Sequence, residues 1–252
     1  SPNLYQRYTW STWTMAANMN NLFGDGNGYV GNVNLKPETA HKIGFLIDHQ
    51  DPNGDWMFKV NPFYSYINDY IDAENTSASR SDGYRNLKFH NHDATIAGID
   101  IAAKRQIFKN TSLGNYDLFA KFNYQRGRNL DNGTDLYNLM PANLSIGLNH
   151  TKNNWKNSFV VKLVDKKDKV DTVRQERETS SFAVADFYTS YQLQSFEIAG
   201  SIENIFDRMH DNPLGGEYIG QGATMSTGVS RATATQTPGI GRSINISIAY
   251  LF

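Results

Sequence analysis

The sequence predicts an all-β fold, an antiparallel transmembrane β-barrel. Apolar and polar residues alternate with a period of two along many segments, whereas helical periodicity is almost absent. Short connections between these segments alternate with long ones. No apolar run approaches the roughly 18–20 residues of a membrane-spanning helix. A mean hydropathy of −0.55 is compatible with a membrane barrel, because only alternate residues of its strands are apolar.

Composition excludes several classes of function. The 252 residues carry 24 Lys and Arg against 25 Asp and Glu, a net charge of −1, which argues against nucleic acid as a partner. The sequence has no cysteine, so disulfides, thiolate metal sites and cysteine nucleophiles are excluded within it. No Walker loop, dinucleotide fingerprint or G-x-S-x-G motif is found. We therefore predict no enzyme activity and no catalytic residue.

Alternation defines the individual strands, most clearly at the C-terminus. There Ile244, Ile246, Ile248, Tyr250 and Phe252 share one face, and small or polar residues occupy the other. Residues 116–126 repeat the pattern, with aromatic and aliphatic side chains on the even positions. In chain order, the expected strands are 39–49, 56–71, 84–107, 116–126, 143–150, 157–164, 182–194, 196–206 and 243–252, with a partial strand at 4–10.

The connections favour a barrel over other all-β folds. The short connections are 51–54, 109–115, 152–154 and 194–195, and the long ones are 11–37, 73–83, 129–141, 165–181 and 211–241. Tight turns at one end and long loops at the other are typical of outer-membrane barrels. The polar face of the last strand carries Ser, Asn and Ala, which suits a wet lumen. A soluble β-sandwich with an aromatic core remains the alternative, since aromatic residues make up 13% of the chain.

Two motifs give a resemblance to a known family. The run Asn34, Leu35, Lys36, Pro37 and Glu38 resembles the segment that leads into a descending strand of TonB-dependent outer-membrane receptors. Residues 98–101 are similar to a second descending strand of these receptors.

The C-terminal part extends the resemblance. Asn204, Phe206 and Asp207 lie in a stretch similar to the penultimate strand of the family. Terminal Tyr250 and Phe252 resemble the aromatic end that the barrel-assembly machinery recognises. These marks follow the family's order and span nearly the whole chain.

The resemblance implies that residues 1–252 supply about ten or eleven C-terminal strands of a 22-stranded plugged barrel. The plug and the N-terminal strands are then expected outside this sequence, and we interpret the start at Ser1 and Pro2 in the same way. The implied location is the bacterial outer membrane. The implied partners are outer-membrane lipid and lipopolysaccharide, the TonB complex acting through the plug, the barrel-assembly machinery and the N-terminal half of the receptor.

The implied function is uptake of a scarce ligand. Residues 10–13, 15–21, 24–29 and 213–222 look most like the copper-receptor branch, with zinc receptors nearby. We therefore expect a metal ion as the transported ligand, copper before zinc, and no covalently bound cofactor. In that branch the metal ligands come from the plug and the early barrel, so none is carried over to this chain. A siderophore receptor of the same family, or a self-contained small barrel acting as a passive pore, remains the alternative.

Several loop residues are candidate metal ligands. Met15 and Met19 are four apart, so one helical turn would place both thioethers on one side, and soft sulfur suits Cu(I). Packing against the barrel rim is the alternative role for both. Met209, His210 and Met225, in the final loop region, are further candidates, with ordinary surface residues as the alternative.

A second candidate is a pair of histidines on an extended segment. His90 and His92 are two apart, so both face the same side of the strand and could hold Zn²⁺ or Cu²⁺. The sequence identifies no third ligand, and two surface histidines beside Asp93 are the alternative.

Two charged segments match no known functional motif. Lys166, Lys167 and Lys169 alternate with acidic residues, which favours either contact with lipopolysaccharide phosphates or a solvated charged hairpin. Residues 25–28 (Asp-Gly-Asn-Gly) are interpreted as a turn, because the rest of a calcium-loop pattern is missing.

Overall fold

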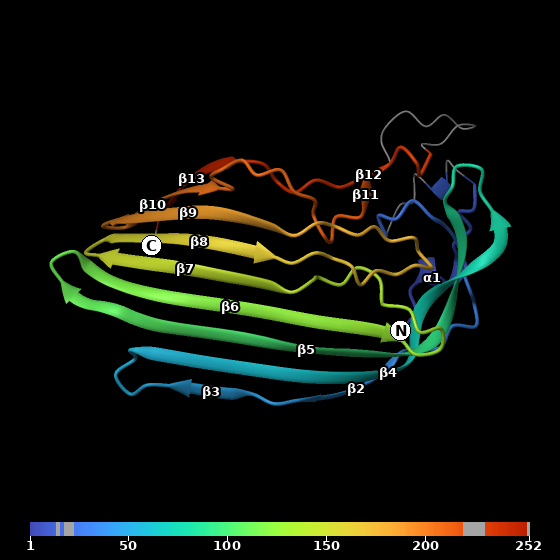
Figure 1. Ribbon diagram of the computed structural model, residues 1–252, viewed down its shortest axis with the longest axis horizontal. Helices are drawn as coiled ribbons and strands as arrows, with labels where there is room; N and C mark the ends of the chain where they lie inside the picture. The colour runs from blue at the N-terminus through green and yellow to red at the C-terminus, as the bar shows by residue number, and fades with distance from the viewer. Residues whose placement is uncertain (14–15, 18–22, 219–229, 251–252) are drawn as a thin grey trace.

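The computed structural model describes residues 1–13, 16–17, 23–218 and 230–250, and its principal feature is one large curved sheet (Figure 1). The elements are α1 (Leu4–Tyr8), β1 (Gly28–Val30), β2 (Thr39–Gly44), β3 (Ile47–Gln50), β4 (Trp56–Ser79), β5 (Arg85–Thr111), β6 (Gly114–Asn129), β7 (Asn143–Lys152), β8 (Trp155–Val164), β9 (Phe182–Leu193), β10 (Phe196–Glu203), β11 (Glu217–Tyr218), β12 (Thr235–Gln236) and β13 (Ser243–Tyr250). The predicted all-β fold is confirmed.

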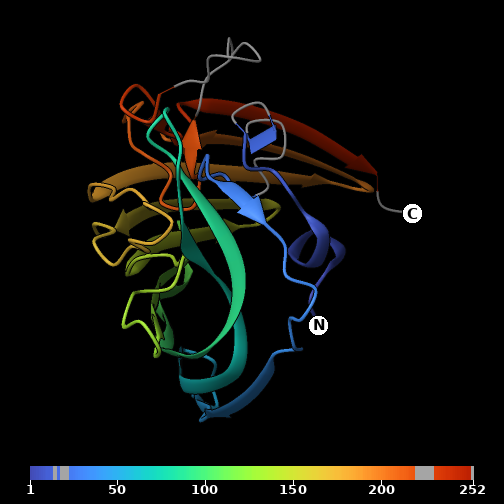
Figure 2. The same cartoon turned by 90° about the vertical axis from the view of Figure 1, so that its right-hand side faces the viewer.

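From β4 to β10, strands that follow one another in sequence are neighbours in the sheet. Its order is β13-β10-β9-β8-β7-β6-β5-β4-β2, with β3 also on β4 and with β1 parallel to β5. The short turns gather at one end and the long loops at the other, as the alternation of connection lengths predicts (Figure 1). Seen from the loop end, the sheet is an open arc, and α1 and β1 lie across its opening (Figure 2).

The strand register separates apolar and polar side chains onto opposite faces. One row of cross-strand partners, from β6 to β13, is apolar: Leu118, Leu148, Phe159, Phe187, Ile202 and Ile244. The next row, one residue along each strand, is polar: Asp117, Asn149, Ser158, Tyr188, Ser201 and Asn245. Ile244, Ile246 and Ile248 of β13 are 70%, 78% and 69% exposed. An apolar outer face and a polar inner face are what a barrel in lipid requires.

Two predicted boundaries are wrong. The predicted loop at 73–83 is largely strand, because β4 and β5 stay paired as far as Ser79 and Arg85. Ala73 is buried there against the core described below, so packing overrides the polar composition of this segment. The predicted partial strand at 4–10 is instead α1, which Asn3 and Gln6 begin with a reciprocal capping box at 2.8 and 2.9 Å. None of the described helices is long and apolar enough to span a membrane.

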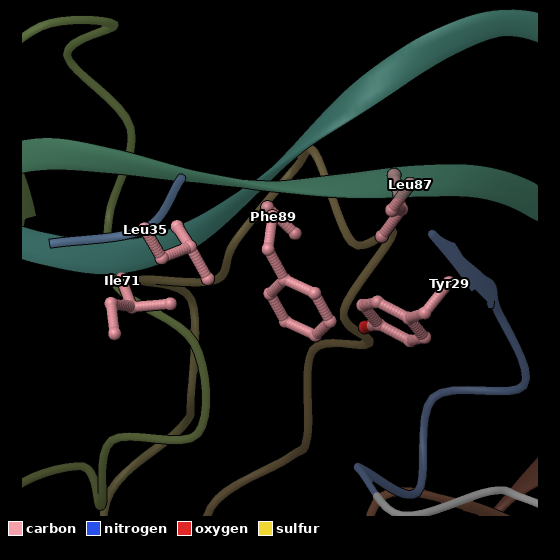
Figure 3. Close-up of a cluster of buried hydrophobic side chains, with 6 residues drawn as sticks. Tyr29, Leu35, Ile71, Leu87 and Phe89 are labelled. Atoms are coloured by element: carbon pink, nitrogen blue, oxygen red, sulfur yellow. The ribbon is translucent and has the colours of Figure 1, made fainter. Parts of the chain in front are cut away.

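A compact apolar core lies at the loop end, between the β4–β5 hairpin and the N-terminal segment (Figure 3). The Tyr29 ring of β1 stacks on Phe89 of β5 at 5.2 Å between centroids. Glycine at position 28 allows β1 to lie this close, since a side chain there would collide with Asn86 and the Ser11 backbone. The buried members of the core are Tyr29, Leu35, Ile71, Ala73, Leu87 and Phe89.

Candidate functional site at the loop end

A buried cluster of charged side chains lies beside this core, and Arg174 is at its centre. Arg174 belongs to the loop between β8 and β9, and its side chain is only 6% exposed. Asp171 shapes the turn that carries it, because its Oδ1 accepts hydrogen bonds from the backbone of Val173 at 2.7 Å and of Arg174 at 3.2 Å. This local capping points the guanidinium back into the molecule.

The Arg174 guanidinium binds groups from several distant segments. It donates to the Tyr29 hydroxyl at 2.8 Å and to Asp72 Oδ1 of β4 at 3.2 Å. Its Nε lies 3.4 Å from Asp171 Oδ2. The guanidinium also lies over the rings of Phe23 and Tyr137, each at 5.0 Å from the centroid.

Further hydrogen bonds tie the surrounding loops to this cluster. The Tyr29 hydroxyl donates to Asp25, and Asn27 Nδ2 donates to the Arg174 carbonyl at 2.7 Å. Asn129, at the end of β6, donates to Asp72 Oδ2 at 3.1 Å. Gly26 has a positive φ, as does Gly24 just before the segment, and the Asn27 N–H donates to Asp25 Oδ1 at 3.1 Å, so the chain turns here before β1 begins at Gly28. Asp25 and Asn27 are buried in the cluster.

Burial controls the ionisation of the cluster. It raises the pKa of Asp171 to about 7, and the nearby Asp72 acts in the same direction. Burial also raises the pKa of Tyr29 well above its usual value, although Arg174 opposes this. Burial disfavours a charged Arg174, but Tyr29, Asp72 and Asp25 outweigh it and raise the pKa of Arg174, which therefore stays charged.

A second buried node joins the final long loop to the same region. Glu217 of β11 accepts from the Tyr84 hydroxyl at 2.9 Å and from Arg177, and Arg231 lies 3.9 Å away. Burial, followed by the Glu217 charge, raises the pKa of Tyr84. The two nodes together connect the N-terminal segment, the β4–β5 hairpin, the β8–β9 loop and the final loop.

This arrangement can position loops, but it offers little to a ligand. Its charged groups already bind one another, and Arg174, Asp72 and Glu217 are buried, whereas Arg177 and Arg231 are partly exposed. Over the described residues, no group of three or more His, Asp or Glu side chains could hold a metal ion. Sequence reasoning missed both nodes, because their members are up to about 150 residues apart and follow no spacing rule.

The predicted metal ligands are not brought together by the described structure. Met15, Met19 and Met225 lie outside the described residues. Met209 is 88% exposed, whereas the His210 ring packs on Phe182 at 4.1 Å, and its Nδ1 lies 3.0 Å from the Arg208 carbonyl.

His90 and His92 do share one side of β5, as predicted. Their Nε2 atoms lie 3.7 and 3.4 Å from the two carboxylate oxygens of Glu74. The expectation of two surface histidines is wrong for His92, whose side chain is only 5% exposed.

The charged segment after β8 is only partly the solvated hairpin that the sequence suggests. Lys166 and Lys169 are exposed and share Asp168, at 2.9 and 3.3 Å. Lys167 is buried, and its Nζ donates to Glu176 at 2.5 Å and to the Pro213 carbonyl at 2.7 Å, which compensates the buried charge. Burial of Lys167 and Asp171 joins this segment to the neighbouring loops instead of to solvent.

The first family motif clamps the start of β2 onto the β4–β5 hairpin. Leu35 is buried in the apolar core, and Arg7 donates to its carbonyl at 2.9 Å. Lys36 exchanges backbone hydrogen bonds with the Asn91 side chain at 2.8 and 3.1 Å. Glu38 Oε1 accepts from the Ile71 backbone N–H at 2.8 Å, just past a bulge in β4. Asn34 and Pro37 are exposed.

The family stretch that contains Asn204, Phe206 and Asp207 ends β10 and aligns the start of β13. Asn204 is buried with a φ of 48°, a region that Asn tolerates better than most residues. Its amide binds the Arg208 backbone at 2.8 and 3.0 Å and the Ile240 carbonyl at 3.2 Å. Asp207 Oδ1 accepts from the Arg242 N–H at 2.9 Å, whereas Phe206 is 76% exposed.

The aromatic C-terminal end is described as far as Tyr250. Tyr250 pairs with Phe196 of β10, with 4.9 Å between ring centroids. Phe252 lies outside the described residues.

Comparison with known proteins decides the family. The model of the TonB-dependent receptor-like β-barrel matches residues 1–205. This chain belongs to that family. Its members are outer-membrane transport receptors, not enzymes, so the predicted location and the absence of an enzyme assignment are confirmed at family level. No curated protein matches the sequence closely enough to count as a relative.

Solved structures show the same fold. The chain is similar to the copper transporter OprC (TM-score 0.72, 17% identity), with 88% of this chain and 32% of that one covered. It is also similar to the ferric yersiniabactin uptake receptor FyuA from Yersinia pestis (0.57, 15%; 84% and 29% covered). A third similar structure is the FrpB iron transporter from Neisseria meningitidis (0.57, 15%; 90% and 33% covered). The chain thus spans about a third of the length of each.

Proposed function

We propose that this chain is the C-terminal part of the barrel of a receptor that imports a scarce metal ion across the outer membrane, copper before zinc. The observation that carries the proposal is the likeness to the copper transporter OprC, at a TM-score of 0.72 against 0.57 for FyuA and FrpB. The wall strands would be β2 to β10 and β13, and the loops joined by Arg174 and Glu217 would form the outer surface that meets the ligand.

The metal-capturing role within this chain is assigned to methionine. Met209 presents its thioether to solvent, and soft sulfur suits Cu(I). Met15, Met19 and Met225 remain candidates for the same role. His210 is a weaker candidate, because its ring already packs on Phe182 and Nδ1 faces a carbonyl.

A siderophore receptor is the second candidate function. It is favoured by the finding that no group of acidic and histidine side chains in the described part of the chain could hold a bare metal ion. A chelated metal needs no such ligands. A self-contained barrel acting as a passive pore is the third candidate function.

The partners follow from the same proposal. The remaining strands would pair with this sheet at its β2 and β13 edges. The plug would connect the barrel to the TonB complex. Tyr250 and Phe252 would be the signal for the barrel-assembly machinery. Exposed Lys166 and Lys169 would contact lipopolysaccharide phosphates, because they share one carboxylate and so leave a positive charge in excess.

Elemental analysis of the purified full-length receptor, after exposure to competing copper and zinc, tests the proposed ligand. We expect bound copper in excess of zinc, and calorimetry should show weaker copper binding by the Met15→Leu, Met19→Leu double variant. Finding neither metal would favour siderophores. Uptake that persists in cells without TonB would favour the passive pore.

A further inference from the structure

A charged side chain interrupts the apolar outer face near the turn end of the sheet. Arg105 of β5 lies opposite Leu118 of β6 on one side and opposite Trp56 of β4 on the other, so it belongs to the same outward-facing row as Leu118. Arg105 is exposed, and its guanidinium has no hydrogen-bond or ion-pair partner among the described residues. A cation on a lipid-facing wall is unfavourable unless it lies near the membrane interface and meets an anion there.

Aromatic rings mark that interface on the same face. Trp56 is 45% exposed and stacks on His49 of β3 at 4.5 Å between centroids. On the far side of the sheet, Trp155 of β8 pairs with Tyr191 of β9 at 4.8 Å, next to their turns. Such rings gather where the acyl region of a membrane meets the headgroups, and the short turns of an outer-membrane barrel face the periplasm. Arg105, beside Trp56, therefore lies at the headgroup level of the periplasmic leaflet, which consists of phospholipid.

A carboxylate occupies the other side of Trp56. The Asp51 N–H donates to the Trp56 carbonyl at 3.0 Å, so Asp51 continues the β3–β4 pairing and shares the outer face with Trp56. The Asp51 side chain accepts the Asn53 N–H at 3.1 Å and has no cationic partner within the described part of the chain. Asp51 and Arg105 are two strand spacings apart, about 10 Å between their backbones. Two opposite and unpaired charges thus flank one indole ring.

A shallow groove connects these two charges to the apolar wall. Asp51 and Arg105 both line it, and the next outward-facing row adds Phe58, Ala103, Ala120 and Ile146. Ala103 and Ala120 form the floor, because their side chains are shorter than those of Phe58 and Ile146 on either side. The groove has a volume of about 1040 Å³. It therefore offers an apolar channel with one cation and one anion at its headgroup end.

We propose that this groove binds one phospholipid of the periplasmic leaflet whose headgroup carries both a phosphate and an ammonium, as in phosphatidylethanolamine. The guanidinium of Arg105 donates to the phosphate, a pairing that its planar fork favours. The ammonium donates to Asp51, and one acyl chain lies along Ala103 and Ala120. A headgroup with a phosphate and no cation leaves Asp51 unpaired beside a second negative charge. The inference rests on the outer-membrane location and is independent of the ligand that the receptor carries.

Native mass spectrometry of the detergent-purified full-length receptor tests the site, with phosphatidylethanolamine or phosphatidylglycerol of the same acyl chains added. We expect the wild type to retain phosphatidylethanolamine on the order of 10-fold better than phosphatidylglycerol. Arg105→Gln should lower the retention of both lipids by a similar factor. Asp51→Asn should remove only the preference between them, because asparagine still accepts from Asn53. Lys152→Gln is the matched control and should behave as the wild type, since Lys152 is an exposed cation at the end of β7, outside the groove.

Three results would overturn the proposal. Equal retention of the two lipids by the wild type, or unchanged retention in Arg105→Gln, would show only unspecific lipid around the barrel. Competition by glycerophosphoethanolamine, which is the same headgroup without acyl chains, would show that the groove takes a soluble phosphate ester instead of a lipid. Asp51→Asn separates the site from a damaged fold, since it should still retain phosphatidylglycerol as well as the wild type does.

Discussion

Replacement of Arg174 by methionine should open the loops while leaving the barrel wall intact. Methionine keeps much of the side-chain length and removes the charge. Asp72, at 3.2 Å, and Asp25, at 4.0 Å, are then buried without their cation, and Tyr29 loses its donor at 2.8 Å. Breaking a buried ion pair from one side costs about 3–5 kcal/mol. At about 1.4 kcal/mol per factor of ten, local opening should become roughly 10²- to 4 × 10³-fold more frequent.

Hydrogen–deuterium exchange of the full-length receptor measures this effect. Protection should fall in residues 23–30 and 165–181, whereas β8 serves as an internal reference for the wall. Arg126→Met is the matched control, since Arg126 pairs with Asp135 at 3.2 Å but is 40% exposed, and such pairs contribute only about 0–1 kcal/mol. Adding Asp72→Asn to Arg174→Met should restore part of the protection. A loss no greater than that of Arg126→Met would refute the reasoning.

Three further predictions concern stability. Burial raises the pKa of Asp171 to about 7, so between about pH 4 and 7 the closed β8–β9 loop keeps a proton that the open loop releases. Opening of this loop should therefore become easier as the pH rises through that window, by up to about 4 kcal/mol. Asp171→Asn should abolish this pH dependence. Asn204→Ala should lower the free energy of unfolding in detergent by about 2–4 kcal/mol, through lost hydrogen bonds and a φ of 48°. Glu38→Ala should cost about 1 kcal/mol and speed exchange of the Ile71 amide.

Each of these three predictions has a control variant or a result that would contradict it. Exchange in residues 165–181 that is independent of pH in the wild type would contradict the Asp171 prediction. Phe206→Ala, in the same motif as Asn204, should change stability by less than about 0.5 kcal/mol, because Phe206 is exposed. Glu38→Gln should behave as the wild type, since its carbonyl oxygen can still accept from Ile71; equal damage by both Glu38 variants would show that the hydrogen bond is not the cause.

The sequence by itself determined which residues share a face of the sheet and which end of the sheet carries the long loops. Side chains alternate faces along any strand, so Ile244, Ile246 and Ile248 had to share one face, whatever the neighbours of β13 turned out to be. Connection lengths likewise separated the turn end from the loop end. The two family motifs were readable as well, because each is a local stretch of chain that shapes its own turn or strand start.

Only the tertiary structure decided what the loops do. Arg174, Asp72 and Tyr29 come from three segments, and no periodicity links residues about 100 and 145 positions apart. The sequence shows Lys167 and Asp171 as members of a polar run, but burial by neighbouring loops makes them interior groups. The same holds for His92, whose two carboxylate neighbours lie on other segments. Local pattern fixes which face a side chain occupies, whereas the cost of burying a charge depends on which groups the fold brings around it.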